Sequence, residues 1–142
     1  MVKYYDAQEL LQMHEFIAKI IDNNAIVIVE GIKDKRALEH LGISSIIVLN
    51  RRPLYAVVEK VAAVYDKTKK LTGERISVII LTDLDTEGKK LYGKLNSGLQ
   101  NFGVRIDNRF REFLFRHTKL RQIEGLANYI TKLEKDIEVE PN

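Results

Sequence analysis

The chain has 142 residues, of which 45% are hydrophobic and 30% charged, with a formal net charge of +3 and no cysteine. This composition excludes an intrinsically disordered chain, and the absence of cysteine excludes disulfides and thiolate metal sites. The sequence has no run apolar enough to span a membrane and no signal-peptide pattern, so we expect one cytoplasmic domain over residues 1–142.

The first third of the chain reads as helix, strand, helix, strand. Apolar residues recur at helical spacing over residues 6–22, and a β-branched apolar run over 25–29 favours a strand. A short helix over 34–41 is predicted to be capped by Asp34. A second strand is expected over 45–49.

The next stretch repeats this alternation. Pro53 suits the first turn of a long helix whose apolar face runs over 54–65. Residues 76–81 are almost all apolar, which is typical of a strand covered on both faces. Thr86 is predicted to cap the following helix, and Gly103 to end it.

The C-terminal third is less regular. Val104 and Ile106 indicate a fourth strand, residues 109–116 an edge strand or irregular segment, and residues 123–137 an amphipathic helix. The alternation of strands and helices predicts an α/β fold, namely a Rossmann-like, open, mainly parallel sheet of about four strands with helices on both faces. The expected parts are an N-terminal helix (6–22), a core (25–107), and a C-terminal basic segment with a helix (108–137).

Three acids follow the ends of two predicted strands. Asp83 and Asp85 come after the strand over 76–81, and Glu30 comes after the strand over 25–29. The carboxyl ends of parallel strands meet at one edge of a sheet, so the three carboxylates are expected to converge there. Their repulsion favours a cation between them, and hard oxygen ligands favour Mg²⁺, or Mn²⁺, over zinc. The sequence thus predicts a metal site formed by Glu30, Asp83 and Asp85, although two solvated aspartates in a surface turn are the simpler reading of the aspartate pair alone.

Residues near these acids are candidates for substrate binding. Lys33 could contact a phosphate, and Arg51 and Arg52 follow the second predicted strand, on the side expected to hold the site. Gly31 and Gly88 are interpreted as positions where the backbone approaches a metal or phosphate closely.

The positive charge of the chain is concentrated between residues 105 and 121. This segment has six cations and two anions, interleaved with phenylalanines. We interpret the phenylalanines as core residues and the arginines as possible contacts to a nucleic-acid backbone.

The acidic motifs resemble those of the toprim domain family, the catalytic module shared by topoisomerases, bacterial-type primases and small nucleases. Residues 29–31 (Val-Glu-Gly) end the first strand, and residues 82–88 (Thr-Asp-Leu-Asp-Thr-Glu-Gly) match the pattern T-D-x-D-x-x-G. The resemblance covers residues 25–106, and the whole chain looks like a small stand-alone toprim protein. Thr86 and Lys89 depart from the arginine and the acid that type I topoisomerases of the family carry, which weakens a topoisomerase reading.

The resemblance implies a magnesium-dependent enzyme acting on nucleic-acid phosphodiester bonds, most simply a nuclease. It implies that Asp83 and Asp85 hold Mg²⁺ and that Glu30 acts as general acid or base. The alternative is a non-catalytic nucleic-acid-binding or adaptor module with protein partners in a processing complex. A further reading is a phosphatase with an aspartyl nucleophile, whose motif is D-x-D-x-T. Here Glu87 occupies the position of the motif's threonine, and no paired aspartates follow on a later strand.

Overall fold

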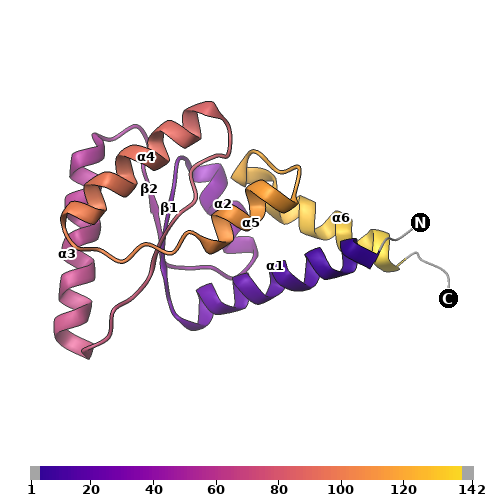
Figure 1. Cartoon of the computed structure of the whole chain (residues 1–142), viewed down its shortest axis with the longest axis horizontal. Helices are drawn as coiled ribbons and strands as arrows, with labels where there is room; N and C mark the ends of the chain where they lie inside the picture. Colours follow the sequence, from indigo (N-terminus) through magenta and orange to yellow (C-terminus); the bar gives the residue numbers. More distant parts are fainter. Residues whose placement is uncertain (1–3, 139–142) are drawn as a thin grey trace.

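The computed structural model describes residues 4–138 and shows a small parallel sheet between helices (Figure 1). The strands are β1 (Ile26–Val29), β2 (Ile46–Val48) and β3 (Val78–Ile80), arranged in the order β2-β1-β3 with both pairs parallel. The helices are α1 (Tyr4–Asp22), α2 (Ile32–His40), α3 (Leu54–Thr72), α4 (Thr86–Asn101), α5 (Arg109–His117), the short 3₁₀ helix η1 (Ile123–Gly125) and α6 (Leu126–Glu138). None of the helices described is both long and apolar enough to cross a membrane.

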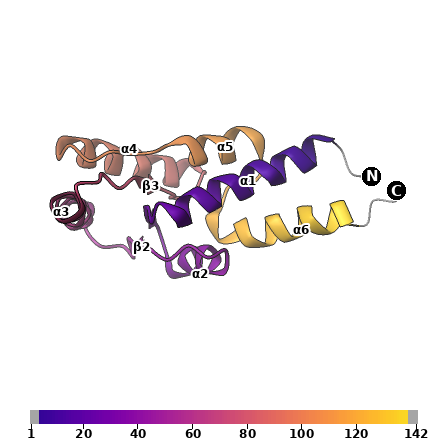
Figure 2. The ribbon, with the colours of Figure 1, turned by 90° about the horizontal axis from the view of Figure 1, so that it is seen from below.

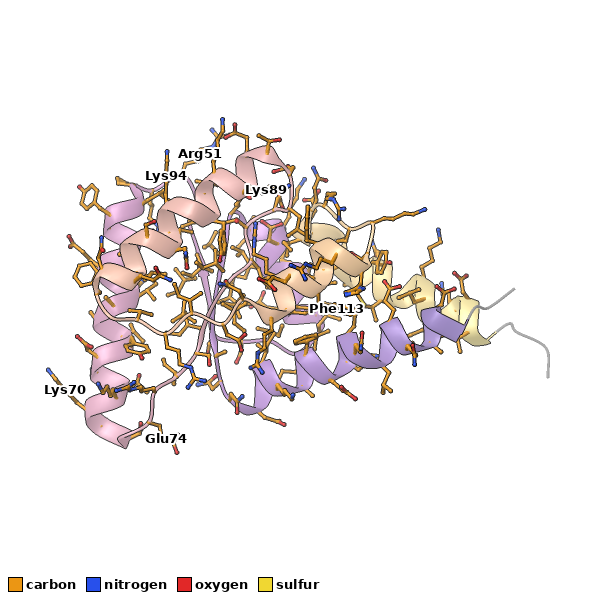
Figure 3. All side chains as sticks on the ribbon, viewed as in Figure 1. Arg51, Lys70, Glu74, Lys89, Lys94 and Phe113 are labelled. Carbon is orange, nitrogen blue, oxygen red and sulfur yellow. The ribbon has the colours of Figure 1, made fainter. Side chains whose placement is uncertain are left out.

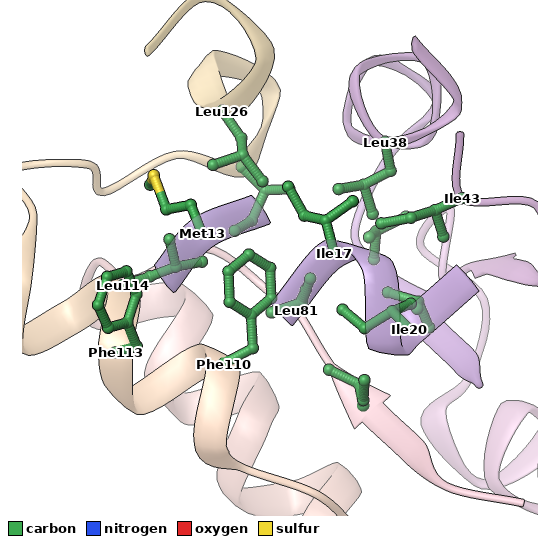
Figure 4. Close-up of a cluster of buried hydrophobic side chains, with 14 of the residues drawn as sticks. Met13, Ile17, Ile20, Leu38, Ile43, Leu81, Phe110, Phe113, Leu114 and Leu126 are labelled. Carbon is green, nitrogen blue, oxygen red and sulfur yellow. The ribbon is translucent and has the colours of Figure 1, made fainter. Parts of the chain in front are cut away.

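Each face of the sheet carries its own hydrophobic core. On β1, Ile26 and Ile28 pack with α3 and α4, whereas Val27 and Val29 pack with α1, α2, α5 and α6. The core around Val27 and Val29 is shown in Figure 4, where side chains of several helices meet around Phe110 and Leu81. Because both faces are covered, the strands need apolar residues at every position, which explains their continuous apolar runs.

The sheet has three strands instead of the predicted four or so. Ile106 forms only an isolated parallel bridge with Val78, whose N–H donates to the carbonyl of Arg105 at 3.1 Å. The chain leaves α4 through Gly103, with φ of 73°, and enters α5 at Arg109. The predicted fourth strand is therefore reduced to this single bridge beside β3.

The edge strand or irregular segment predicted over 109–116 is wrong, because α5 occupies these residues. Phe110, Phe113 and Leu114 are buried against α1 and α6, at the i, i+3, i+4 spacing of one helical face. Their contacts with α1 include ring centroid distances of 5.3 and 5.4 Å from Phe16 to Phe110 and Phe113. The helical period was present in the sequence, but the arginines between the phenylalanines obscured it.

Several helix ends differ from the prediction. Gly31, not Asp34, is the N-cap of α2, and Asp85, not Thr86, is the N-cap of α4. Pro53 is the N-cap of α3 and so stands just before the first turn. The helix expected over 6–22 begins at Tyr4, and α1 lies beside α6 as an arm that extends away from the sheet (Figure 2).

Candidate functional site

The carboxyl ends of β1 and β3 are joined by a contact between two acidic residues. The backbone N–H of Asp83 donates to Oε2 of Glu30 at 2.6 Å, a bond between residues 53 positions apart. Since β1 and β3 are neighbours in register, each strand delivers its following residue to the same edge of the sheet. The structure therefore brings Glu30 and Asp83 together.

Asp85 lies beside this pair at the start of α4. Its Oδ1 accepts the N–H of Gly88 at 2.8 Å, so Asp85 caps the helix, while the intervening Leu84 is buried. Oδ1 of Asp83 accepts the N–H of Ile123 at 2.9 Å, which ties the loop after β3 to η1. Each carboxylate thus uses one oxygen on backbone N–H groups and leaves its second oxygen available.

The site carries more negative charge than its cations balance. Burial raises the pKa of Glu30, and repulsion from Asp83, Asp34 and Asp85 raises it further, against the bond from the N–H of Asp83. Burial likewise raises the pKa of Asp83, opposed by the Ile123 N–H, while Asp85 and Glu124 repel its charge. Such crowding of carboxylates disfavours full ionisation unless positive charge is brought in.

The donor chemistry of this cluster fits a hard cation, because all its available ligands are carboxylate oxygens. Over residues 4–138, however, no three His, Cys, Asp or Glu side chains are grouped so that they could hold one metal ion. Glu30, Asp83 and Asp85 thus do not form a closed three-residue ligand set in this geometry. Asp83 and Asp85, which flank Leu84, supply two carboxylates at the rim of the site.

Arg111 binds the backbone of the loop that carries Asp83. Arg111 is 7% exposed, and its guanidinium donates to the carbonyls of Ile80 at 3.2 Å, Thr82 at 2.6 Å and Asp83 at 3.0 Å. Its Cζ lies over the ring of Tyr92, 4.6 Å from the ring centroid. These carbonyls lie at the last residue of β3 and in the loop that follows it. Arg111 therefore holds the backbone that presents Asp83.

Gly88 is required by close packing in the same loop. A Cβ at this position would lie 1.9 Å from the carbonyl oxygen of Asp83, and the hydroxyl of Thr82 donates to the carbonyl of Gly88 at 2.6 Å. Gly31 is different. A Cβ there would meet only Oδ2 of Asp34 at 3.8 Å, with φ of −140°, so close approach does not explain this glycine.

Comparison with known proteins places the chain among archaeal relatives. A UPF0292 protein of Thermococcus onnurineus is 35% identical over 123 residues, which span 86% of this chain and 84% of the relative. The chain belongs to the UPF0292 family. A UPF0292 protein of Methanocaldococcus jannaschii is 28% identical over 88% of this chain and 92% of its own length. No protein-family model matches the chain.

A solved structure shares this fold. A putative protein from Aquifex aeolicus is 32% identical, with a TM-score of 0.59, and the match covers 78% of this chain and 94% of that one. The likeness therefore extends over most of both chains.

The predicted phosphate ligands near β2 of this UPF0292 chain differ in their freedom. Arg52 is tied to the turn after the strand, because its Nε donates to the carbonyl of Leu49 at 3.2 Å and its Nη2 donates to that of Val48. Arg51 is exposed, with φ of 59°. In Figure 3 it lies toward the top of the view, as does Lys89 at the start of α4.

Lys33 lies on the exposed side of α2. With Arg36, His40 and Glu124 it lines an open pocket of about 620 Å³. A second open pocket, of about 450 Å³, contains Asp85 together with Lys119, Arg121, Glu124 and Tyr129. Glu124 borders both pockets, so cations from α2 and from the segment before η1 lie on two sides of Glu124.

Sequence reasoning missed Arg111 and Glu124 as contributors to the site and interpreted Asp34 as a helix cap. Arg111 was counted only among the cations of its segment, although its place three residues before buried Leu114 puts it near the inner face of α5. Glu124 and Asp34 join the acidic cluster through the packing of η1 against α2, for which the sequence offers no local signal.

Proposed function

We propose that this protein is a magnesium-dependent enzyme that cleaves or transfers phosphodiester bonds in nucleic acids, most simply a nuclease. The observation that carries the proposal is the contact between Glu30 and the backbone of Asp83, which sets acids from two neighbouring strands at one edge of the sheet. The resemblance of residues 29–31 and 82–88 to the toprim motifs supports the same reading.

In this proposal each acid has a distinct role. Asp83 and Asp85 would hold Mg²⁺, or Mn²⁺, with water completing the coordination shell. When bound, the ion supplies positive charge to the phosphate and lowers the pKa of bound water. Glu30 is fixed through Oε2 and holds or transfers a proton at Oε1, while Arg111 keeps the backbone of Asp83 in place.

A second function has an observation in its favour. Over the described residues no three-residue metal-ligand group is formed, and the three carboxylates each bond a backbone N–H, as purely structural acids do. The alternative is therefore a non-catalytic nucleic-acid-binding or adaptor module that acts with protein partners.

Glu30→Gln separates these functions. The substitution keeps the size of the side chain and an oxygen for the Asp83 N–H, but it removes proton transfer. With labelled RNA and DNA and either Mg²⁺ or Mn²⁺, we expect cleavage to fall roughly a hundredfold or more while affinity for the same oligonucleotide changes little. Glu87→Gln is the matched control, because Glu87 is exposed in the first turn of α4 and pairs only with Lys90, at 3.7 Å, in the described structure.

One result would instead support the adaptor. In that case the wild-type protein, purified free of contaminating nuclease, cleaves neither RNA nor DNA with any divalent metal. Its affinity for the oligonucleotide then rises in Glu30→Gln, because one negative charge has left a crowded acidic site.

A further inference from the structure

Phe115, on the outer side of α5, is 40% exposed. Two cations from other elements lie over its ring: Nζ of Lys89 at 4.2 Å from the ring centroid and Cζ of Arg121 at 4.8 Å. We define these three side chains as the Phe115 platform. Its exposure distinguishes Phe115 from Phe110 and Phe113, which are buried in the core.

The Phe115 platform adjoins the acidic site. Lys89 follows Asp85 by one turn of α4, and its N–H donates to the carbonyl of Asp85 at 2.9 Å. On the other side, the carbonyl of Arg121 accepts the N–H of Leu84 at 2.7 Å. Both cations of the platform are thus anchored by backbone contacts to the loop that carries the aspartates.

Pockets lie on both sides of the platform. One, of about 280 Å³, is lined by Leu84, Lys89, Tyr92 and Phe115 together with Asn108, two arginines (Arg111 and Arg116) and the acidic Glu112. The other contains both Arg121 and Asp85. A ligand whose flat ring packs against Phe115 could therefore extend past Arg121 toward Asp85.

The two cations are held differently. Nη1 of Arg121 donates to the carbonyls of Thr118 at 3.1 Å and Leu120 at 2.6 Å, which fixes its planar guanidinium. Within the described structure, the ammonium of Lys89 makes no comparable hydrogen bond and is exposed. A flexible, strongly hydrated ammonium can leave the ring for a phosphate, whereas the fixed guanidinium stays stacked.

We infer that Phe115 stacks an unpaired base of a single-stranded nucleic acid, with Lys89 and Arg121 contacting the adjoining phosphates. This inference deepens the proposed function, and rests on it, by naming the substrate class. A base within a duplex already has neighbours stacked on both faces, so only an unpaired base offers a face to the ring. The combination of an aromatic ring with flanking cations is the chemistry that recognises such a strand.

The test uses fluorescence without any metal or cleavage. The chain contains no tryptophan, so Phe115→Trp introduces a single reporter at the platform. With a short single-stranded DNA, and separately the RNA of the same sequence, we expect the fluorescence to be quenched. A duplex of that sequence leaves it unchanged. Phe102→Trp is the matched control, because Phe102 is 55% exposed at the far end of α4 and is expected to respond to neither strand.

A second measurement addresses the ring itself. Phe115→Ala is expected to weaken single-strand binding roughly tenfold, while Phe115→Tyr, which keeps the ring, binds as the wild type does. Equal quenching by single strand and duplex, or unchanged affinity in Phe115→Ala, overturns the inference. The quenching is measured without metal, so its outcome is independent of the cleavage assay. If the protein cleaves nucleic acid but shows no quenching, only the stacking site is contradicted. If quenching occurs but the protein cleaves neither RNA nor DNA, stacking is supported and the enzyme is contradicted.

Discussion

Gly88 and Gly31 show how two glycines in similar sequence contexts have different physical roles. Gly88 lies where the first turn of α4 touches the backbone of Asp83, and no side chain fits between them. Gly31 lies in extended backbone with room for a Cβ. The first glycine is therefore a requirement of packing, and the second serves as the N-cap of α2.

We expect Gly88→Ala to lower the free energy of unfolding by at least about 2 kcal/mol, because the added Cβ must displace backbone atoms. Gly31→Ala is expected to cost about 1 kcal/mol or less, the usual loss at an N-cap. Urea denaturation of both variants measures the difference. Equal losses would mean that the close approach to Asp83 does not govern the choice of glycine.

At the scale of the element, the start of α5 is held by hydrogen bonds between Asp107, which precedes the N-cap Asn108, and Arg109, the first residue of the helix. Oδ1 of Asp107 accepts the backbone N–H of Arg109 at 3.0 Å, and Oδ2 accepts its Nη2 at 2.7 Å. The hydrogen bond from the side chain of Arg109 lowers the pKa of Asp107 below its ordinary value of 3.8, against a smaller opposing effect of burial. The helix therefore begins beside an ionised carboxylate, as the helix dipole favours.

This shift predicts a pH dependence of stability. Because the folded pKa is lower than the unfolded one, ionised Asp107 stabilises the fold above pH 3.8, and the stabilisation is lost as the pH falls through the folded value. Wild type should thus be more stable than Asp107→Asn near neutral pH, and this gap should narrow in acid. Urea denaturation curves of both proteins, recorded from neutral pH down to acid pH, measure this difference in stability. Asp66→Asn, on the exposed side of α3, is the control for removing a surface carboxylate. A gap that stays constant with pH would contradict the assignment.

At the scale of the whole molecule, the topology places cations at opposite edges of the sheet. Arg51 follows β2 at the edge that carries the acids, whereas Lys70 lies near the end of α3, just before the chain returns to the start of β3. In Figure 3 Arg51 lies near the top of the view and Lys70 at the lower left. A nucleic-acid strand bound across the proposed site should therefore contact Arg51 and not Lys70.

We expect Arg51→Glu to weaken binding of a single-stranded oligonucleotide severalfold, while Lys70→Glu, the same charge reversal at the other edge, changes it little. Wild-type affinity should fall roughly tenfold or more between about 50 and about 200 mM salt, because phosphate contacts release counterions. Fluorescence anisotropy in the absence of metal measures both effects. Equal losses in the two variants would point to a general attraction by net charge.

The sequence by itself determined the parts of this protein that depend on local pattern. Continuous apolar runs predict the buried strands β1 and β3. Since Glu30, Asp83 and Asp85 come just after these runs, the sequence alone places them near the carboxyl ends of the two strands. The parallel α/β fold follows from alternation of strands and helices, which permits few other arrangements.

Only the tertiary structure decided which distant groups meet. Arg111 finds its carbonyl partners 28 to 31 residues away, and Asp83 finds the N–H of Ile123 across 40 residues. Packing against α1 and α6 also decided that residues 109–117 form a helix, which exposed Phe115 while burying Phe110. Hydrogen bonds and packing at such separations leave no periodic trace in the chain, because each partner's local pattern is compatible with many others.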